Sequence, residues 1–156
     1  MLSKTLNRSL TRRKNEDGFT LIELLVVVVI LGILIGIAIP VYLNYRKSAN
    51  DKAAQSDLRG AVSTLEVCNS ENGTYPDTAT FTAGATAGTS GIACTGQTVN
   101  VSSGTTMSYS FTSPNFKVVS TNSGGSGKYY CYSSATGGSV RSVTASTLAG
   151  ALTACT

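Results

Sequence analysis

An apolar run of 21 residues, positions 19–39, constrains this chain more than any other feature of its sequence. The run reads FTLIELLVVVVILGILIGIAI and contains one charged residue, Glu23. A helix of that length rises about 30 Å, which matches the thickness of the hydrocarbon core of a bilayer. The sequence therefore predicts a membrane-spanning helix near the N-terminus.

The charge ahead of the run predicts its orientation. Residues 1–18 carry a net charge of +3 and residues 19–156 carry +1, within a total of +4. Basic residues before an apolar helix hold that end in the cytoplasm, although Arg46 and Lys47 after the run reduce the asymmetry. We expect a single span of the cytoplasmic membrane with its N-terminus inside and the rest of the chain outside.

The apolar run differs from an ordinary secretory signal peptide. It is longer than the usual run of about 7–15 residues, and no small-x-small cleavage site follows it before the polar sequence begins. Instead, residues 41–45 lead directly into another helical stretch. We expect the apolar helix to be retained in the mature protein.

The stretch from 46 to 71 has the period of an amphipathic helix. Its apolar residues follow one another at intervals of three and four positions: Ala54, Leu58, Ala61, Leu65 and Cys68. The two stretches predict one long helix from about residue 19 to 71, bent near Pro40, because proline disrupts the helical hydrogen bonds. Asn72 and Gly73 supply a stop signal.

The remainder of the chain is rich in Gly, Ser and Thr and predicts a small sheet. Residues 74–106 suggest a loop, and four short β-rich runs follow: Met107–Phe111, Phe116–Ser120, Lys128–Ser133 and Val140–Val143. Turn-forming residues between the runs favour antiparallel pairing. The predicted fold class is α+β, with one long N-terminal helix packed on a small antiparallel sheet.

Composition argues against catalysis. The chain has no His, so the commonest general base and metal ligand is missing. Its acidic residues after Glu23 lie on or near the predicted helix with no spacing typical of an active site. We expect no enzymatic activity, no catalytic or metal-binding residues and no cofactor.

The junction at residue 18 resembles a known family. GFTLIELLVVVVILGILIGIAIP at 18–40, preceded by a basic leader, is similar to the class III signal of type IV pilins and type II secretion pseudopilins. The resemblance implies cleavage between Gly18 and Phe19 by a prepilin peptidase, followed by N-methylation of Phe19. A residue without Cβ allows the close backbone approach that such cleavage needs. The alternative is that Gly18 is only the last loop residue before a helix.

The resemblance also implies an assembly role for Glu23. A carboxylate in the bilayer costs on the order of 3 kcal/mol, so it normally has a partner. That partner would be the amino group of Phe19, most usefully of a neighbouring subunit, although Glu23 lies one turn from its own Phe19. Another interpretation is a Glu that faces lipid headgroups. Gly32, Gly36 and Pro40 are candidates for a stretch that unwinds during assembly.

The expected organisation has four parts. Residues 1–18 form a leader that is removed, 19–43 a transmembrane and filament-core helix, 44–73 its amphipathic continuation, and 74–156 a globular pilin head. The spacing of Cys131 and Cys155 resembles the C-terminal disulfide loop of pilins. We favour pairing Cys68–Cys94 and Cys131–Cys155, while other pairings, and a buried free thiol at Cys68, stay open.

The functional hypothesis is a structural subunit of a type IV pilus, which polymerises with its own copies. A pseudopilin of a secretion or DNA-uptake system is the alternative, and a signal-anchored binding protein that does not polymerise is the next. Expected partners are the prepilin peptidase, an inner-membrane assembly platform and, before assembly, membrane lipid. A DNA-binding patch at Lys117, Lys128 and Arg141 is a weaker hypothesis than a solvated face.

Overall fold

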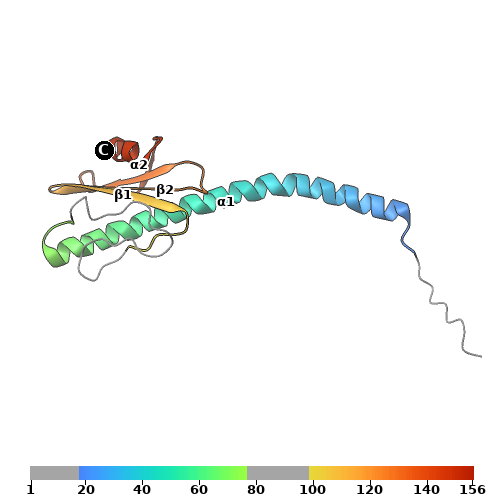
Figure 1. Cartoon of the computed structure of the whole chain (residues 1–156), viewed down its shortest axis with the longest axis horizontal. Coiled ribbons are helices and arrows are strands. Elements are labelled where there is room, and N and C mark those ends of the chain that lie inside the picture. Colours follow the sequence, from blue (N-terminus) through green and yellow to red (C-terminus); the bar gives the residue numbers. More distant parts are fainter. Residues whose placement is uncertain (1–17, 77–98) are drawn as a thin grey trace, which may run out of the picture. The chain divides into compact units, whose positions relative to one another are not determined.

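The computed structural model describes residues 18–76 and 99–156, and the chain divides into two compact units, one ending at Pro40 and one beginning at Val41. Helix α1, Leu21–Asn72, is 52 residues long and continues through Pro40 (Figure 1). It confirms the long helix predicted for residues 19–71. Gly73 ends it with a φ of 72° and donates its N–H to the carbonyl of Asn69, as expected of a glycine stop.

The helical residues before Pro40 are exposed throughout. Each large apolar side chain from Phe19 to Ile39 keeps about half or more of its surface accessible, with Leu21 at 82%. Among the described residues, α1 is the one helix long and apolar enough to cross a membrane, with a mean hydropathy of 3.2 over its most apolar window. The large apolar side chains of this segment are therefore not buried against the described part of the chain.

The second unit contains a four-stranded antiparallel sheet in the order β1-β2-β3-β4. The strands are β1 at Thr105–Thr112, β2 at Asn115–Asn122, β3 at Tyr129–Ser133 and β4 at Arg141–Val143. Each of the four β-rich runs forms a strand, and their pairing is antiparallel as expected. The α+β fold class is confirmed.

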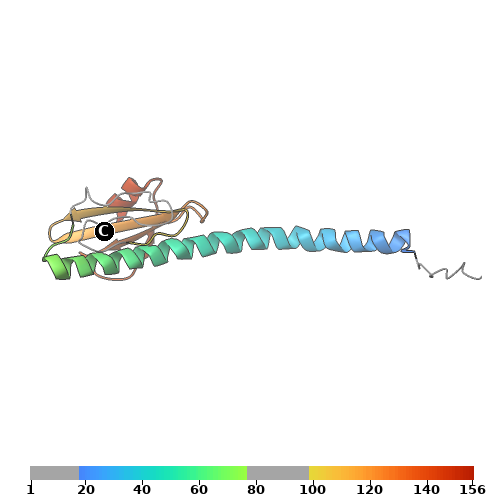
Figure 2. The same ribbon diagram turned by 60° about the horizontal axis from the view of Figure 1, so that its bottom comes forward.

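The C-terminal part of α1 covers one face of this sheet (Figure 2). The residues predicted to form its apolar stripe are all fully buried: Ala54, Leu58, Ala61, Leu65 and Cys68. They share a core with alternate strand residues, including Met107, Tyr109 and Val118. Burial of this stripe, worth about 25 cal/mol per Å² of apolar surface, holds the helix to the sheet.

Aromatic side chains fill the end of this core near the helix stop. The ring of Phe116 lies 4.6 Å from that of Tyr75 and 5.6 Å from that of Tyr132, measured between centroids. The Tyr75 hydroxyl donates to the Glu66 carboxylate at 2.9 Å. These aromatic rings add large apolar surfaces to a sheet whose strands are rich in Ser and Thr.

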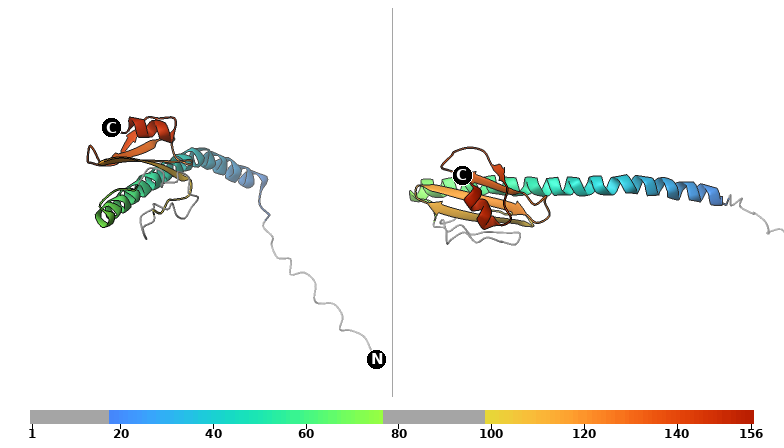
Figure 3. Two further views of the ribbon diagram at one scale, coloured as in Figure 1. Left: turned by 60° about the vertical axis from the view of Figure 1, so that its left-hand side comes forward. Right: turned by 90° about the horizontal axis from the view of Figure 1, so that it is seen from above.

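A short helix that the sequence did not lead us to expect lies against the opposite face (Figure 3). This helix, α2 at Leu148–Ala154, begins at Thr147, whose hydroxyl accepts the N–H of Gly150 at 3.1 Å. Ala151 packs with Val119 in a second buried cluster. The C-terminal tail thus contains a helix that packs on the second face of the sheet.

Candidate processing and assembly segment

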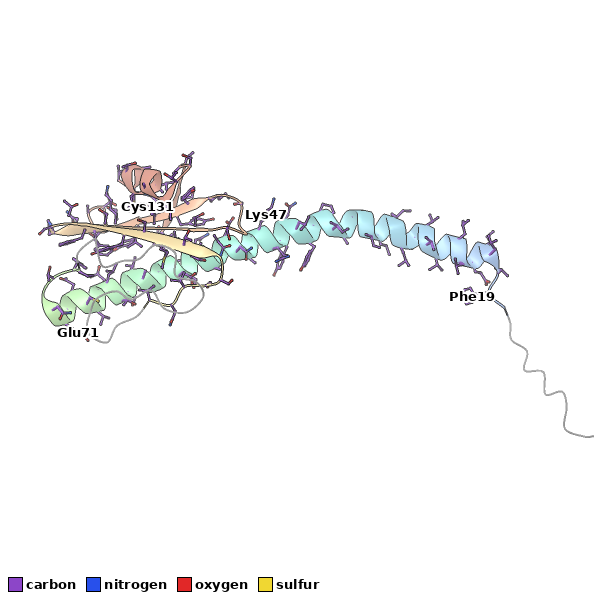
Figure 4. The ribbon with its side chains drawn as sticks, in the orientation of Figure 1. Phe19, Lys47, Glu71 and Cys131 are labelled. Atoms are coloured by element: carbon purple, nitrogen blue, oxygen red, sulfur yellow. A yellow bond between two sulfur atoms is a disulfide. The ribbon has the colours of Figure 1, made fainter. Side chains whose placement is uncertain are left out.

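The predicted cleavage site lies on an exposed, non-helical stretch just before α1. Gly18, Phe19 and Thr20 are all exposed, and Phe19 keeps 79% of its surface accessible (Figure 4). A Cβ added at Gly18 would meet no atom within 4 Å. Packing among the described residues therefore does not require glycine here. A requirement for glycine would come from the peptidase that is expected to cleave at this site.

Helix α1 begins with a capping box formed by Thr20 and Glu23. The Glu23 N–H donates to Thr20 Oγ1 at 3.3 Å, and the backbone N–H of Thr20 donates to Glu23 Oε2 at 2.9 Å. The Thr20 hydroxyl also donates to Oε2, at 2.7 Å. A reciprocal pair of this kind satisfies N–H groups that have no partner inside the helix.

The capping box changes the expectation for Glu23. Its carboxylate has partners within its own chain, and both Thr20 donors use Oε2, so Oε1 makes no hydrogen bond among the described residues. The structure is that of the uncleaved chain, in which the Phe19 nitrogen is a peptide amide and not an amino group. Pairing of Glu23 with a Phe19 amino group stays a prediction for the processed form.

Thr20 is a site residue that the sequence analysis missed. The signal was available, because Thr-x-x-Glu directly before an apolar run is the sequence pattern of a capping box.

The apolar residues around Glu23 form an open surface. Phe19, Ile22, Val26 and Val27 line it together with Glu23. Further along, a Cβ at Gly32 or Gly36 would meet nothing within 4 Å, so packing among the described residues does not require glycine at either position. The helix is continuous at these glycines and at Pro40, and their unwinding during assembly stays a prediction.

The cysteines of the second unit follow part of the expected pattern. Cys131 on β3 and Cys155 after α2 form a disulfide with a Cα–Cα distance of 5.8 Å, as the favoured pairing states. Cys68 is disulfide-bonded, so the free-thiol interpretation is wrong. Cys94, its predicted partner, lies outside the described residues.

Two aspartates of α1 have roles that the sequence analysis did not find. Asp51 and Asp57 are 8% and 9% exposed, and each accepts hydrogen bonds from a serine of a distant loop. Asp57 Oδ2 accepts the N–H of Ser102 at 2.8 Å, and its Oδ1 accepts the Ser102 hydroxyl at 2.9 Å. Asp51 binds Ser126 in the same way. These carboxylates fasten loops to the helix.

The basic residues weighed as a DNA-binding patch are only partly brought together. The strand register places Lys117 on β2 opposite Ser133, and Arg141 on β4 opposite Cys131, so both project from the face that α2 covers. Lys128 lies outside the strands, just before β3. No group of three or more metal-ligating side chains occurs in the described part of the chain.

Comparison with known proteins matches the N-terminal part of the chain. A family model described as the prokaryotic N-terminal methylation motif covers residues 13–39. Type II secretion system core protein G of Pseudomonas aeruginosa is 37% identical over 67 residues, which are 43% of this chain and 47% of that protein. The same-named protein of Aeromonas hydrophila is 34% identical over 67 residues, again 43% and 47% of the two chains.

A pilus protein is also among the relatives. The type IV wide pilus major component PilA4 of Thermus thermophilus is 44% identical over 62 residues, 40% of this chain and 47% of that protein. The alignments span about half the length of the relatives. The methylation motif, the long apolar helix and these relatives confirm the resemblance: the chain carries the N-terminal segment of the pilin and pseudopilin family.

Proposed function

We infer that this chain is the precursor of a structural subunit of a type IV pilus. Cleavage after Gly18 leaves Phe19 as the N-terminus, which is then N-methylated. The apolar half of α1 holds the subunit in the cytoplasmic membrane, with the head outside, until the subunit joins an extracellular filament. The methylation motif at residues 13–39 and the relatives named for pilus and secretion assemblies support this proposal.

The observation that carries the proposal is the apolar surface at the N-terminal end of α1. Every large apolar residue from Phe19 to Ile39 is exposed within the chain. An apolar surface of this extent marks a membrane or protein interface, because soluble monomers rarely expose one. A bilayer and a bundle of identical helices are two environments that would cover it, and a filament subunit uses them in turn.

Processing supplies Glu23 with a stronger partner than it has in the precursor. Thr20 donates hydrogen bonds to Glu23 Oε2 but neutralises no charge. Cleavage creates a cationic amino group at Phe19. When that amino group belongs to a neighbouring subunit, docking removes the cost of a lone carboxylate in an apolar setting, which is on the order of 3 kcal/mol.

Electron microscopy and mass spectrometry together test the proposal. Cells that express the chain should carry surface filaments, and sheared filaments should contain a subunit that begins at Phe19 and bears one methyl group. Filaments built from subunits that retain Met1–Gly18 would contradict the processing step. A chain that stays uncleaved and monomeric in the membrane would instead indicate a signal-anchored binding protein.

A pseudopilin of a secretion system is the second candidate. The similarity to type II secretion system core protein G favours it. The Cys131–Cys155 disulfide, which resembles the C-terminal loop of pilins, favours the pilus. Deletion of the gene separates the two: loss of surface filaments supports the pilus, whereas loss of protein secretion in cells without such filaments supports the pseudopilin. Neither role includes enzymatic activity.

A further inference from the structure

The exposed charges of α1 within the second unit are sorted along the helix. The basic side chains come first and the acidic ones last: Arg46, Lys47, Lys52, Arg59, Glu66 and Glu71. Burial of Asp51 and Asp57 produces this order, because both carboxylates that would interrupt the basic section face inward and bind loops. Figure 4 labels Lys47 in the basic section and Glu71 at the acidic end.

Three of these residues form one straight stripe. Lys52, Arg59 and Glu66 are seven positions apart, so successive members are displaced by only about 20° around the helix. Helical steps of about 100° place Lys52 about 160° from the buried Ala54 and Glu66 about 80° from the buried Leu58, so the stripe runs from the outer side of the helix onto its flank. All three side chains are exposed.

The stripe has no ionic partner within the described residues. Neighbouring members are separated by a rise of about 10 Å along the helix, which is too far for an ion pair. Glu66 accepts a hydrogen bond from Tyr75, and neither Lys52 nor Arg59 pairs with a described carboxylate. Lys52, Arg59 and Glu66 thus follow one another as exposed charges, and none of them forms an ion pair with a described residue.

We propose that this stripe docks a second, parallel copy of the chain with an axial stagger. The inference rests on the proposed function, since subunits anchored in one membrane share one orientation. Copies in register would set each charge against its own counterpart, and like charges repel. A displacement of fourteen residues, about 20 Å, sets Glu66 of one copy against Lys52 of the other and opposes no like charges of the stripe. A displacement of seven residues, about 10 Å, sets Glu66 against Arg59 but also Arg59 against Lys52, so it has one attraction and one repulsion where the in-register pair has three repulsions.

A stagger of this kind has a consequence for assembly. The contact joins different parts of two identical surfaces, so it is heterologous and does not close on itself. Each copy offers its acidic end to one neighbour and its basic section to the next. The charge order would therefore select a continuing filament over an in-register dimer.

The surface beside Arg59 has room for a neighbour's side chain. An open depression of about 330 Å³ borders this arginine, and its other lining residues come from α1, from β3 and from the stretch leading into β4: Val62, Tyr132, Gly138, Ser139 and Val140. A guanidinium presents a planar fork of donors that matches a carboxylate. Arg59 is thus placed to bind a Glu66 carboxylate that enters from another copy.

Charge reversal in the full-length chain tests the proposal. K52E/R59E makes the stripe wholly acidic and E66K makes it wholly basic, so each alone should lower the yield of sheared filaments at least about fivefold. The inverted chain K52E/R59E/E66K restores opposite charges and should recover at least half of the wild-type yield. Co-expression of K52E/R59E with E66K should recover filaments that contain both variants.

Matched controls exclude simpler explanations. Tyr75→Phe removes the hydrogen bond to Glu66 but keeps its charge, and Lys128→Glu reverses an exposed charge away from the stripe. Both should leave the filament yield within twofold of wild type. Immunoblots of membranes establish that all variants accumulate equally.

Several outcomes would overturn the inference. Wild-type yields from both K52E/R59E and E66K would do so, as would failure of both the inverted chain and the mixture to recover filaments. A Tyr75→Phe yield as low as that of E66K would assign the effect to the lost hydrogen bond. If the wild-type chain forms no filaments, the proposed function is refuted instead. If the charge variants form filaments at the wild-type yield while Glu23→Ala forms none, only the stagger is refuted.

Discussion

The Asp51 carboxylate of α1 accepts two hydrogen bonds from Ser126, one from its backbone N–H at 3.0 Å and one from its hydroxyl at 2.5 Å. The neighbouring Asn50 side chain donates to the carbonyl of Gly124 at 2.8 Å, so the whole β2–β3 loop is held to the helix. A Cβ at Gly125 would collide with Asp51 Oδ1, so a larger residue there would have to displace the carboxylate that binds Ser126. The β2–β3 loop therefore packs closely against α1 and is held there by these hydrogen bonds.

Replacement of Asp51 by Ala should destabilise the head. The change removes two charge-assisted hydrogen bonds and leaves the Ser126 N–H without its acceptor, which should lower the free energy of unfolding by about 2 kcal/mol. Urea denaturation of the full chain in detergent, followed by near-ultraviolet circular dichroism of the tyrosines, measures this. Lys52→Ala, at an exposed neighbouring position, should shift the free energy by less than about 0.5 kcal/mol. Equal urea midpoints for Asp51→Ala and Lys52→Ala would show that the Asp51–Ser126 hydrogen bonds do not stabilise the head.

Tyr75 should make the head sensitive to alkali. Burial, followed by the hydrogen bond to Glu66, raises the pKa of Tyr75 from 10.0 to about 12. The folded state therefore keeps a proton that the unfolded chain loses near pH 10, so the stabilisation is complete below pH 10 and is lost as the pH rises toward 12. Burial also raises the pKa of Tyr130, which acts in the same direction.

Tyr75→Phe separates these contributions. The variant should lose less stability than the wild type between pH 10 and 12, although Tyr130 preserves part of the dependence. Thermal unfolding at a series of pH values provides the measurement. Identical pH profiles for the two proteins would show that Tyr75 does not couple to folding.

The disulfide between Cys131 and Cys155 should stabilise the C-terminal layer. The two residues are 24 positions apart, and the chain-entropy model assigns a loop of that size about 3 kcal/mol. The double variant C131S/C155S should unfold at a lower temperature and release α2 first, since Cys155 directly follows that helix. Hydrogen exchange at Leu148–Ala154 reports the release. Unchanged exchange there would show that packing of Ala151 alone holds the helix.

Thr20 should control the order of the first turn of α1. Thr20→Ala removes the hydroxyl that binds Glu23, and loss of an N-cap costs about 1 kcal/mol, or about fivefold in local opening. Amide exchange at Glu23 in detergent should accelerate accordingly. Thr20→Ser keeps the hydroxyl and should exchange like the wild type; if it behaves like the alanine variant, the capping box is not responsible.

Glu23 should be needed for assembly and not for membrane anchoring. Glu23→Ala removes the lone carboxylate from the apolar run, so the subunit should accumulate in the membrane while few or no filaments form. Immunoblots of membrane and sheared fractions compare the two populations. A normal filament yield from this variant would contradict the role proposed for the Phe19 amino group.

The long helix and the strands could be predicted because their signals are local. An apolar run, a stripe at intervals of three and four, and β-rich runs between turn residues each lie within a few neighbouring positions. Helix α2 escaped prediction because it has only seven residues, including a glycine, and depends on a cap at Thr147 and on packing of Ala151. The Thr20 capping box was equally local and could have been found.

The sequence by itself determined the N-terminal segment of this protein, because the apolar helix, its single acid and the methylation motif all lie in consecutive residues. Only the tertiary structure decided which charges of α1 reach solvent. Asp51 and Asp57 lie on the flanks of the buried stripe, where a helical pattern alone would leave them exposed. Their partners Ser126 and Ser102 are 75 and 45 residues away, and only folding of the head brings them to the helix.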